Sequence, residues 1–275
     1  MDLFLKILST SFGIHADTGS WIDFLAALWQ PFITKESPPA PDVEIHLETS
    51  SEGWTVIFEG SSPFDIPDPW RLAEAIRHRI LEDAVGREID HVLLHAGVVS
   101  RGEHCLLLVG RSGAGKTTLT LDLTRRGWDL ASDDHAPIRR DLSVLPLPTP
   151  VGVKQMDQWE ELRSLWEVPA WLPAPTTRFL VPASAFSVSS EERLRPTLLV
   201  FPEFRSIGGP QVCDLSPAKA VTELSRFVRV LDEKALRTLG DLARTTPATS
   251  ISYASSESAW NLLEQRVTPS PYPFA

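Results

Sequence analysis

The chain has 275 residues, enough for one large domain or for a catalytic domain with a smaller companion. Its composition, 43% hydrophobic and 23% charged residues, is typical of a globular protein with a sizeable core. The net charge of −10 argues against nonspecific binding to nucleic acid or to anionic membranes, because both normally require a basic surface.

The N-terminus and the cysteines both favour a cytoplasmic protein. Residues 1–8 are largely apolar but lack the basic region that begins a signal peptide, and no run of about 18 apolar residues occurs in the chain. Cys105 and Cys213 lie far apart without metal-ligand spacing, so we interpret both as buried, reduced thiols.

The first part of the chain predicts a small α+β region over residues 1–87. A short helix is expected within 21–32, followed by a proline-rich connector at 35–42 that cannot propagate a helix. Residues 43–49 and 54–60 alternate apolar and polar side chains around a polar turn, which predicts a hairpin.

A helix is expected next over residues 69–84. Asp68 provides a capping carboxylate before a proline at the first helical position, and Leu72, Ile76 and Ile80 recur every fourth residue. Gly86 is a plausible end for this helix.

From His91 onward the pattern changes to short apolar runs typical of strands covered on both faces, so we assign residues 88–275 to an α/β catalytic domain. The middle of this region, 141–196, is rich in proline and tryptophan and shows no clear periodicity. The remaining predicted strands are 92–100, 104–110, 128–132, 198–204 and 250–255, and the predicted helices are 117–127, 216–228, 232–244 and 257–266.

A phosphate-binding loop is the strongest motif in the sequence. Residues 110–117 match G-x-x-x-x-G-K-[ST] without a mismatch, after an apolar strand and before a helix. Glycines let consecutive N–H groups turn toward phosphate oxygens, the lysine adds a positive charge, and the threonine hydroxyl can reach Mg²⁺. The expected nucleotide contacts are Gly110, Ser112, Gly113, Ala114, Gly115, Lys116, Thr117 and Thr118.

Two aspartates are expected to face this loop. Asp133 and Asp134 follow the strand that comes directly after the loop helix, and parallel strands of such a unit end at the same edge of the sheet. One carboxylate could hold Mg²⁺ while the other accepts a proton from an attacking hydroxyl.

The block from Leu93 to Ile138, which contains both motifs, resembles the HPr serine kinase/phosphorylase superfamily. It is closer to the HPr-kinase-like branch linked to peptide modification, including lasso-peptide biosynthesis, and the similarity extends weakly through residues 148–154, 198–204 and 215–224. The resemblance implies a P-loop kinase core of the type shared by HPr kinase and phosphoenolpyruvate carboxykinase, using ATP and Mg²⁺.

The resemblance also implies roles for individual residues. Asp133 would be the base toward a serine hydroxyl, and Asp134 would assist the metal together with Thr117, although this division could be reversed. His95, on the strand before the loop strand, would join the catalytic group with Lys116. Taken alone, a histidine in an apolar strand is more often a core residue with its hydrogen bonds satisfied.

This sequence departs from the HPr enzyme in one respect. It lacks the downstream EIRG-type stretch that supplies an acidic residue near the metal, which argues against HPr as the substrate and against the reverse phosphorylase reaction. Lys154 lies in a segment that resembles a lysine-containing loop of the kinase-like branch, so it is a candidate contact for phosphate or substrate.

We therefore expect an ATP-dependent kinase that phosphorylates a hydroxyl, in particular a serine of a peptide or small protein. A small-molecule hydroxyl kinase and a nucleotide-binding switch or inactive kinase module are the alternatives. No nucleic-acid or membrane partner is expected, and the resembled enzymes are oligomers, which allows a homo-oligomer here.

Overall fold

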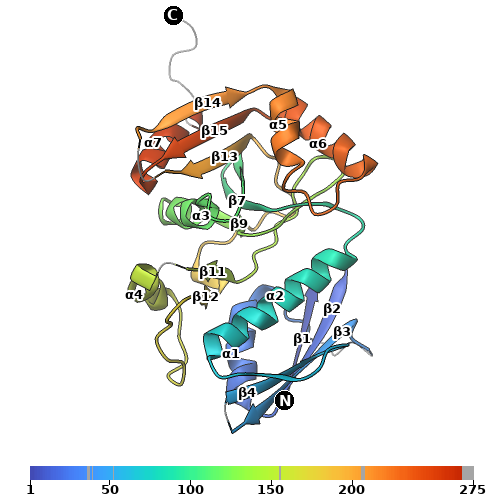
Figure 1. Cartoon of the computed structure of the whole chain (residues 1–275). Coiled ribbons are helices and arrows are strands. Elements are labelled where there is room, and N and C mark those ends of the chain that lie inside the picture. Colours follow the sequence, from blue (N-terminus) through green and yellow to red (C-terminus); the bar gives the residue numbers. More distant parts are fainter. Residues whose placement is uncertain (36–37, 39, 52, 155, 206–207, 268–275) are drawn as a thin grey trace, which may run out of the picture. The chain divides into compact units, whose positions relative to one another are not determined.

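The computed structural model describes residues 1–267 except 36–37, 39, 52, 155 and 206–207, so part of the predicted connector at 35–42 lies outside the described residues. The fold is mixed α/β with several sheets, as predicted in outline (Figure 1). The chain forms two compact units, one containing Met1–Ile89 and Thr149–Phe186, the other containing Asp90–Pro148 and the chain from Ser187 onward.

The first unit is built on a five-stranded sheet with the order β1-β2-β3-β4-β5. Strands β1 (Asp2–Ile7) and β2 (Thr10–Ala16) form an antiparallel hairpin, and α1 (Gly19–Trp29) connects β2 to the parallel strand β3 (Val43–Ser50). Strands β4 (Gly53–Phe58) and β5 (Phe64–Ile66) complete the sheet in antiparallel fashion. The hairpin predicted at 43–60 is confirmed, whereas β1 and β2 were not predicted.

Helix α2 (Pro69–Arg87) begins as expected, because the Asp68 carboxylate accepts hydrogen bonds from the backbone N–H groups of Trp70 and Arg71. It passes through Gly86 and ends one residue later, so the predicted stop at the glycine is slightly early. A short helical turn, η1 (Gln30–Phe32), follows α1.

The proline- and tryptophan-rich segment 149–186 packs with the first unit. It contains β11 (Val151–Val153) paired with β12 (Phe179–Val181), and the short helical elements η2 (Met156–Gln158), α4 (Trp159–Leu162), η3 (Arg163–Leu165) and η4 (Ala183–Ala185). The indole N–H of Trp70 donates to the Pro173 carbonyl at 2.8 Å, and its ring meets that of Trp159 edge-on. The predicted domain boundary between residues 87 and 88 stays a prediction. In the structure, the chain returns to the first unit over Thr149–Phe186.

The second unit is built on a six-stranded sheet with the order β14-β15-β13-β8-β7-β9. Strands β8 (His104–Val109), β13 (Leu198–Phe204) and β15 (Ala248–Tyr253) are parallel to one another. The strands β7 (Ala96–Arg101), β9 (Asp129–Ser132) and β14 (Gln211–Leu215) pair in antiparallel fashion with their neighbours, and β6 (Val92–Leu94) pairs with β10 (Ala136–Ile138). Strand β9 therefore runs in the same direction as β8, with β7 between them.

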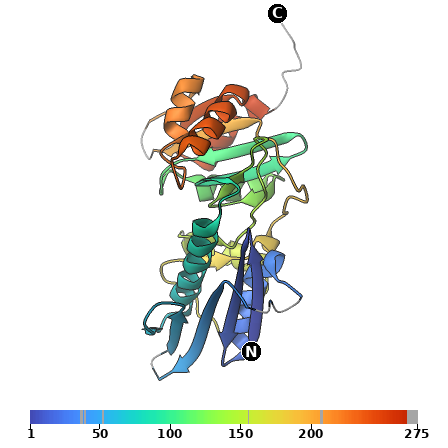
Figure 2. The same ribbon diagram turned by 90° about the vertical axis from the view of Figure 1, so that its right-hand side faces the viewer.

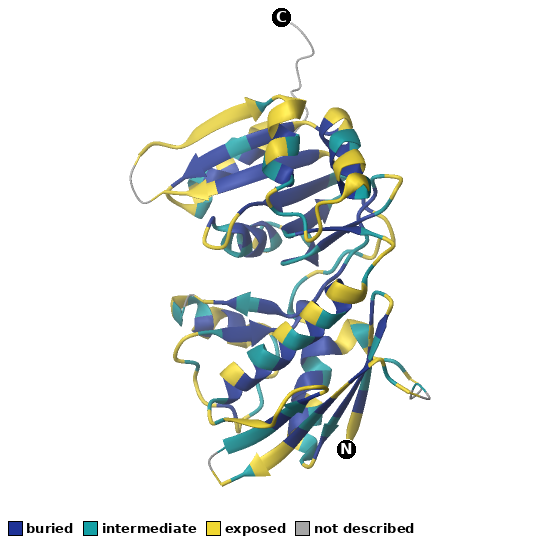
Figure 3. Cartoon of the chain, turned by 45° about the vertical axis from the view of Figure 1, so that its right-hand side comes forward, coloured by how far each residue is buried: buried dark blue, intermediate teal, exposed yellow. Residues whose placement is uncertain are grey.

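Helices cover both faces of this sheet, as the turned view in Figure 2 shows. Leu107 points to the side covered by α5 (Pro217–Leu224) and α6 (Glu233–Thr245), whereas its neighbours Leu106 and Leu108 point to α3 (Lys116–Arg125) and α7 (Ser256–Val267). The continuous apolar runs in the sequence follow from this two-sided burial, visible in Figure 3 as dark strands between helices with exposed outer faces.

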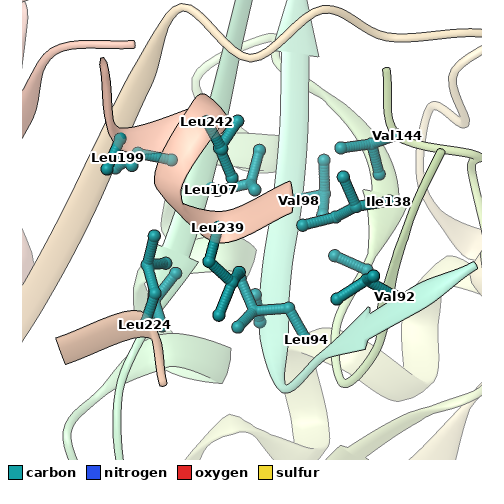
Figure 4. Packing of buried hydrophobic residues seen from close by; sticks show 14 of the residues in the cluster. Val92, Leu94, Val98, Leu107, Ile138, Val144, Leu199, Leu224, Leu239 and Leu242 are labelled. Atoms are coloured by element: carbon teal, nitrogen blue, oxygen red, sulfur yellow. The ribbon is translucent and has the colours of Figure 1, made fainter. Parts of the chain in front are cut away.

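The core beneath α6 is closely packed (Figure 4), where Leu239 and Leu242 lie over strand residues that include Val98 and Leu107. We expect Leu239→Ala to lower the free energy of unfolding by about 2–5 kcal/mol, because a fully buried side chain is lost. Leu236→Ala on the same helix removes a side chain that is 47% exposed and should change stability by less than about 0.5 kcal/mol. Urea unfolding of both variants tests the difference, and equal losses would contradict it.

The structure also bears on the two cysteines and on membrane-spanning helices. Cys105 is buried, but Cys213 is exposed on the edge strand β14, so the prediction of two buried thiols is wrong for Cys213. Among the described residues, no helix has both the length and the apolar character needed to cross a bilayer.

Candidate active site

The loop between β8 and α3 has the backbone conformation that its glycines predict. Gly113 and Gly115 have φ angles of +82° and +95°, a region that L side chains rarely adopt. The N–H of Ala114 donates to the Arg111 carbonyl at 3.1 Å, which closes a turn within the loop. Helix α3 begins directly afterwards at Lys116, and the first N–H groups of a helix point beyond its start. Such a helix start binds anions.

Two neighbouring strands hold the loop from outside. The N–H of Phe204, at the end of β13, donates to the Ala114 carbonyl at 3.2 Å, and the Tyr253 hydroxyl, at the end of β15, donates to the Gly115 carbonyl at 3.4 Å. The two aromatic rings contact each other edge-on. The loop is thus fixed by contacts from residues far away in sequence, which the motif does not reveal.

Lys116 folds back across its own loop. Only 6% of the residue is exposed, and its ammonium group donates to the carbonyls of Gly110 at 2.7 Å and Arg111 at 3.3 Å. Its third close contact is with Nε2 of His95, at 3.1 Å. The side chain therefore links the loop to His95, which lies between β6 and β7.

His95 interrupts the strand predicted over 92–100. Its backbone N–H donates to the Phe227 carbonyl at 2.7 Å, so the chain breaks into β6 and β7 at this residue. In the side chain, Nδ1 lies 2.8 Å from the Asp134 carbonyl oxygen, so this nitrogen must carry a hydrogen. Nε2 is then the acceptor for the Lys116 ammonium, and the arrangement corresponds to a neutral imidazole with a defined tautomer.

The two aspartates differ sharply in their surroundings. Asp133 is only 2% exposed, and its Oδ2 accepts a hydrogen bond from the Thr117 hydroxyl at 3.3 Å. The Asp134 side chain is 26% exposed and its Oδ1 lies 3.9 Å from Nδ1 of His95. One carboxylate therefore faces the start of α3, while the other lies at an accessible position beside the histidine.

The group formed by Thr117 and Asp133 suits Mg²⁺. This cation prefers oxygen ligands and is commonly bound by one or two protein groups, with waters and substrate phosphates completing its shell. Among the described residues, no three or more His, Cys, Asp or Glu side chains gather to form a metal cage. A phosphate-bound Mg²⁺ does not require one.

The structure brings together five of the residues predicted for the site, which come from three different segments: His95, Lys116, Thr117, Asp133 and Asp134. Ser112 and Gly113 are exposed on the loop, Ala114 is buried in it, and Thr118 lies in the first turn of α3. Lys154 is exposed after β11 in the first unit, so its contact with phosphate or substrate stays a prediction.

Tyr253 gives the site a measurable response to alkaline pH. Burial, with a further contribution from the Asp122 carboxylate, raises the pKa of its phenol to about 12. Because the unfolded phenol titrates near pH 10, the folded state loses stability as pH rises from about 10 to 12. We expect Tyr253→Phe to flatten this part of a urea-unfolding profile against pH. An unchanged slope would show that the phenol is not responsible.

Comparisons with known proteins give a weak structural similarity and no match in sequence. No family model matches the sequence, and no curated protein matches it. Among solved structures, the chain is similar to the Hpr(Ser) kinase/phosphatase from Coxiella burnetii, with 13% sequence identity and a TM-score of 0.31. The match covers 63% of this chain and 89% of that protein, and a similarity at this level does not identify an activity.

Proposed function

We propose that the second unit transfers the γ-phosphoryl group of ATP to a hydroxyl group, in particular a serine of a peptide or small protein. The observation that carries the proposal is the convergence of a buried lysine, a histidine and two carboxylates on a glycine loop that precedes a helix. The start of α3 and Lys116 would bind the phosphates. Of the two carboxylates, one would bind a metal ion and the other would accept the proton of the acceptor hydroxyl. ATP as the nucleotide rests on the family resemblance of the sequence.

In the proposed reaction, the acceptor oxygen forms a bond to the γ-phosphorus as the bond to the β,γ-bridging oxygen breaks. The bonding electron pair leaves with ADP, and the proton of the hydroxyl passes to a carboxylate. The role of Lys116 is to offset the charge on the transferred group, and Thr117 with Asp133 would hold Mg²⁺, which further neutralises the phosphates.

We assign the base to Asp134, which reverses the division implied by the resemblance. A base must touch a hydroxyl that arrives from solvent, and Asp134 is accessible whereas Asp133 is almost completely buried. Asp133 already lies against the threonine hydroxyl expected to face the metal. His95 would position Lys116 and the Asp134 backbone through the two ring nitrogens.

The function is tested by incubating the full chain with Mg²⁺ and ATP in the presence of a mixed set of serine peptides, with products identified by mass. We expect one phosphate on a peptide serine and stoichiometric ADP, and loss of at least about 10²-fold in rate for Lys116→Met. Lys234→Met, a lysine of α6 outside the site, is the matched control and should retain the rate. Nucleotide binding without any transfer to these peptides would contradict the proposal and favour a small-molecule acceptor or a nucleotide-dependent switch.

A further inference from the structure

A cavity of about 780 Å³ borders the start of the glycine loop within the second unit. Its lining includes Val109, Gly110 and Arg111, together with residues of α5 and of the segment that follows it. Its size lies within the range of about 300–1,000 Å³ usual for ligand sites.

The position of the cavity suits the binding of an acceptor beside the terminal phosphate of a nucleotide. In loops of this type the lysine reaches the β- and γ-phosphates, and here the Lys116 ammonium lies on the carbonyls of Gly110 and Arg111. The cavity is lined by these same two residues, so it would adjoin the γ-phosphate end of a nucleotide bound as proposed, from which an acceptor hydroxyl must approach. Phe227, also in the lining, accepts the backbone hydrogen bond of His95 and so ties this wall to the candidate catalytic group.

The charges around the cavity favour an acidic ligand. Arg226 donates to both carboxylate oxygens of Glu223 at 2.8 Å, so these two lining residues neutralise each other. Glu203 accepts a hydrogen bond from Arg205 at 2.7 Å, and this bond lowers the pKa of the Glu203 carboxyl. The other two charged residues of the lining, Arg111 and Lys219, are both basic and exposed, and the charge of Arg111 also contributes to lowering the pKa of Glu203.

The rest of the lining is largely apolar, with Phe201, Leu215, Ala218 and Phe227 beside the hydroxyls of Thr222 and Ser250. We propose that this cavity binds the acceptor, a peptide segment that carries a carboxylate and an apolar side chain beside the reacting hydroxyl. The carboxylate is paired with Lys219 and Arg111, and the apolar side chain packs against the phenylalanines. This inference rests on the proposed kinase activity and names its substrate class.

The test uses four short serine peptides that share a leucine and differ only in charge. One contains Glu with an amidated C-terminus, one contains Gln with a free C-terminal carboxylate, one contains Gln with an amide, and one contains Lys with an amide. The first two distinguish a side-chain from a terminal carboxylate. We expect KM to be lower by about tenfold or more for at least one carboxylate peptide than for the uncharged one.

Variants of Lys219 decide whether the cavity is responsible. Lys219→Glu is expected to erase the preference for the carboxylate peptide, and Lys219→Ala to reduce it, whereas the control Lys234→Glu on α6 keeps it. Equal KM values for all four peptides, or a preference that survives in Lys219→Glu, would overturn this inference while leaving the kinase activity intact. Transfer to none of the peptides by the wild-type protein would overturn both the inference and the proposed function.

Discussion

Replacing Asp134 by asparagine is expected to lower kcat for phosphoryl transfer by about 10²–10⁴-fold, because a positioned base contributes rate enhancement of that size. Nucleotide affinity in the presence of Mg²⁺ should stay within about twofold of wild type, since the Asp134 side chain lies beside His95, whereas Asp133 is the carboxylate that accepts from Thr117. Asparagine keeps the shape of the side chain and the backbone carbonyl that accepts from His95. Single-turnover kinetics and equilibrium binding of a fluorescent ATP analogue give the two readouts.

Asp133→Asn is the matched control, since it makes the same change one residue earlier. We expect it to raise the Mg²⁺ concentration needed for half-maximal rate, because a neutral amide is a weaker ligand than a carboxylate beside the Thr117 hydroxyl. High Mg²⁺ should recover part of the rate in Asp133→Asn and none of it in Asp134→Asn. The opposite pattern would restore the assignment implied by the family resemblance, with Asp133 as the base.

The difference in burial between Asp133 and Asp134 could not be predicted from the sequence. Their adjacency after a strand predicts that both lie at the loop edge of the sheet, and the structure places them there. Which of two neighbouring carboxylates is buried depends on how the turn packs against β6, β7 and α3. In the structure the Asp134 carbonyl accepts from both the backbone N–H of Ala96 and Nδ1 of His95.

Sequence signals within a few residues correctly predicted the helix starts that depend on capping side chains. The Asp68 cap of α2 and the Asp232 cap of α6 both form, because capping joins groups that are only two or three residues apart. Strands β1 and β2 were not predicted, although the buried residues Leu3, Leu5 and Ile7 alternate with less buried positions as a half-buried strand requires. One of these intervening positions is Phe4, which weakens the alternation of apolar and polar residues in the sequence.

Features that depend on long-range contacts could not be predicted. A continuous apolar strand was expected over 92–100, but His95 leaves the sheet because its N–H finds an acceptor in Phe227. The return of residues 149–186 to the first unit depends on aromatic contacts such as that between Trp70 and Trp159. The hydroxyl of Tyr253, at the far end of the sequence, completes the surroundings of the loop motif.

This contact with Tyr253 makes Gly115→Ala the most damaging single change expected in the loop. A Cβ on Gly115 would lie too close to the Tyr253 hydroxyl oxygen, and the residue would also keep a φ of +95°, which strains alanine. We expect a loss of stability of about 2–4 kcal/mol and at least tenfold weaker nucleotide binding, because the start of α3 must shift. Thermal unfolding and titration with the ATP analogue measure the two effects.

Gly113→Ala separates backbone strain from collision. Gly113 has a similar φ of +82°, but a Cβ there would meet no atom within 4 Å, so only the strain of about 1–2 kcal/mol should appear. In the double variant Gly115→Ala with Tyr253→Phe, the colliding oxygen is absent and the nearest remaining ring atom lies 3.4 Å from the Cβ. We therefore expect this double variant to recover much of the nucleotide affinity lost in Gly115→Ala. If it binds no better than the single variant, the Tyr253 hydroxyl does not set the position of the loop.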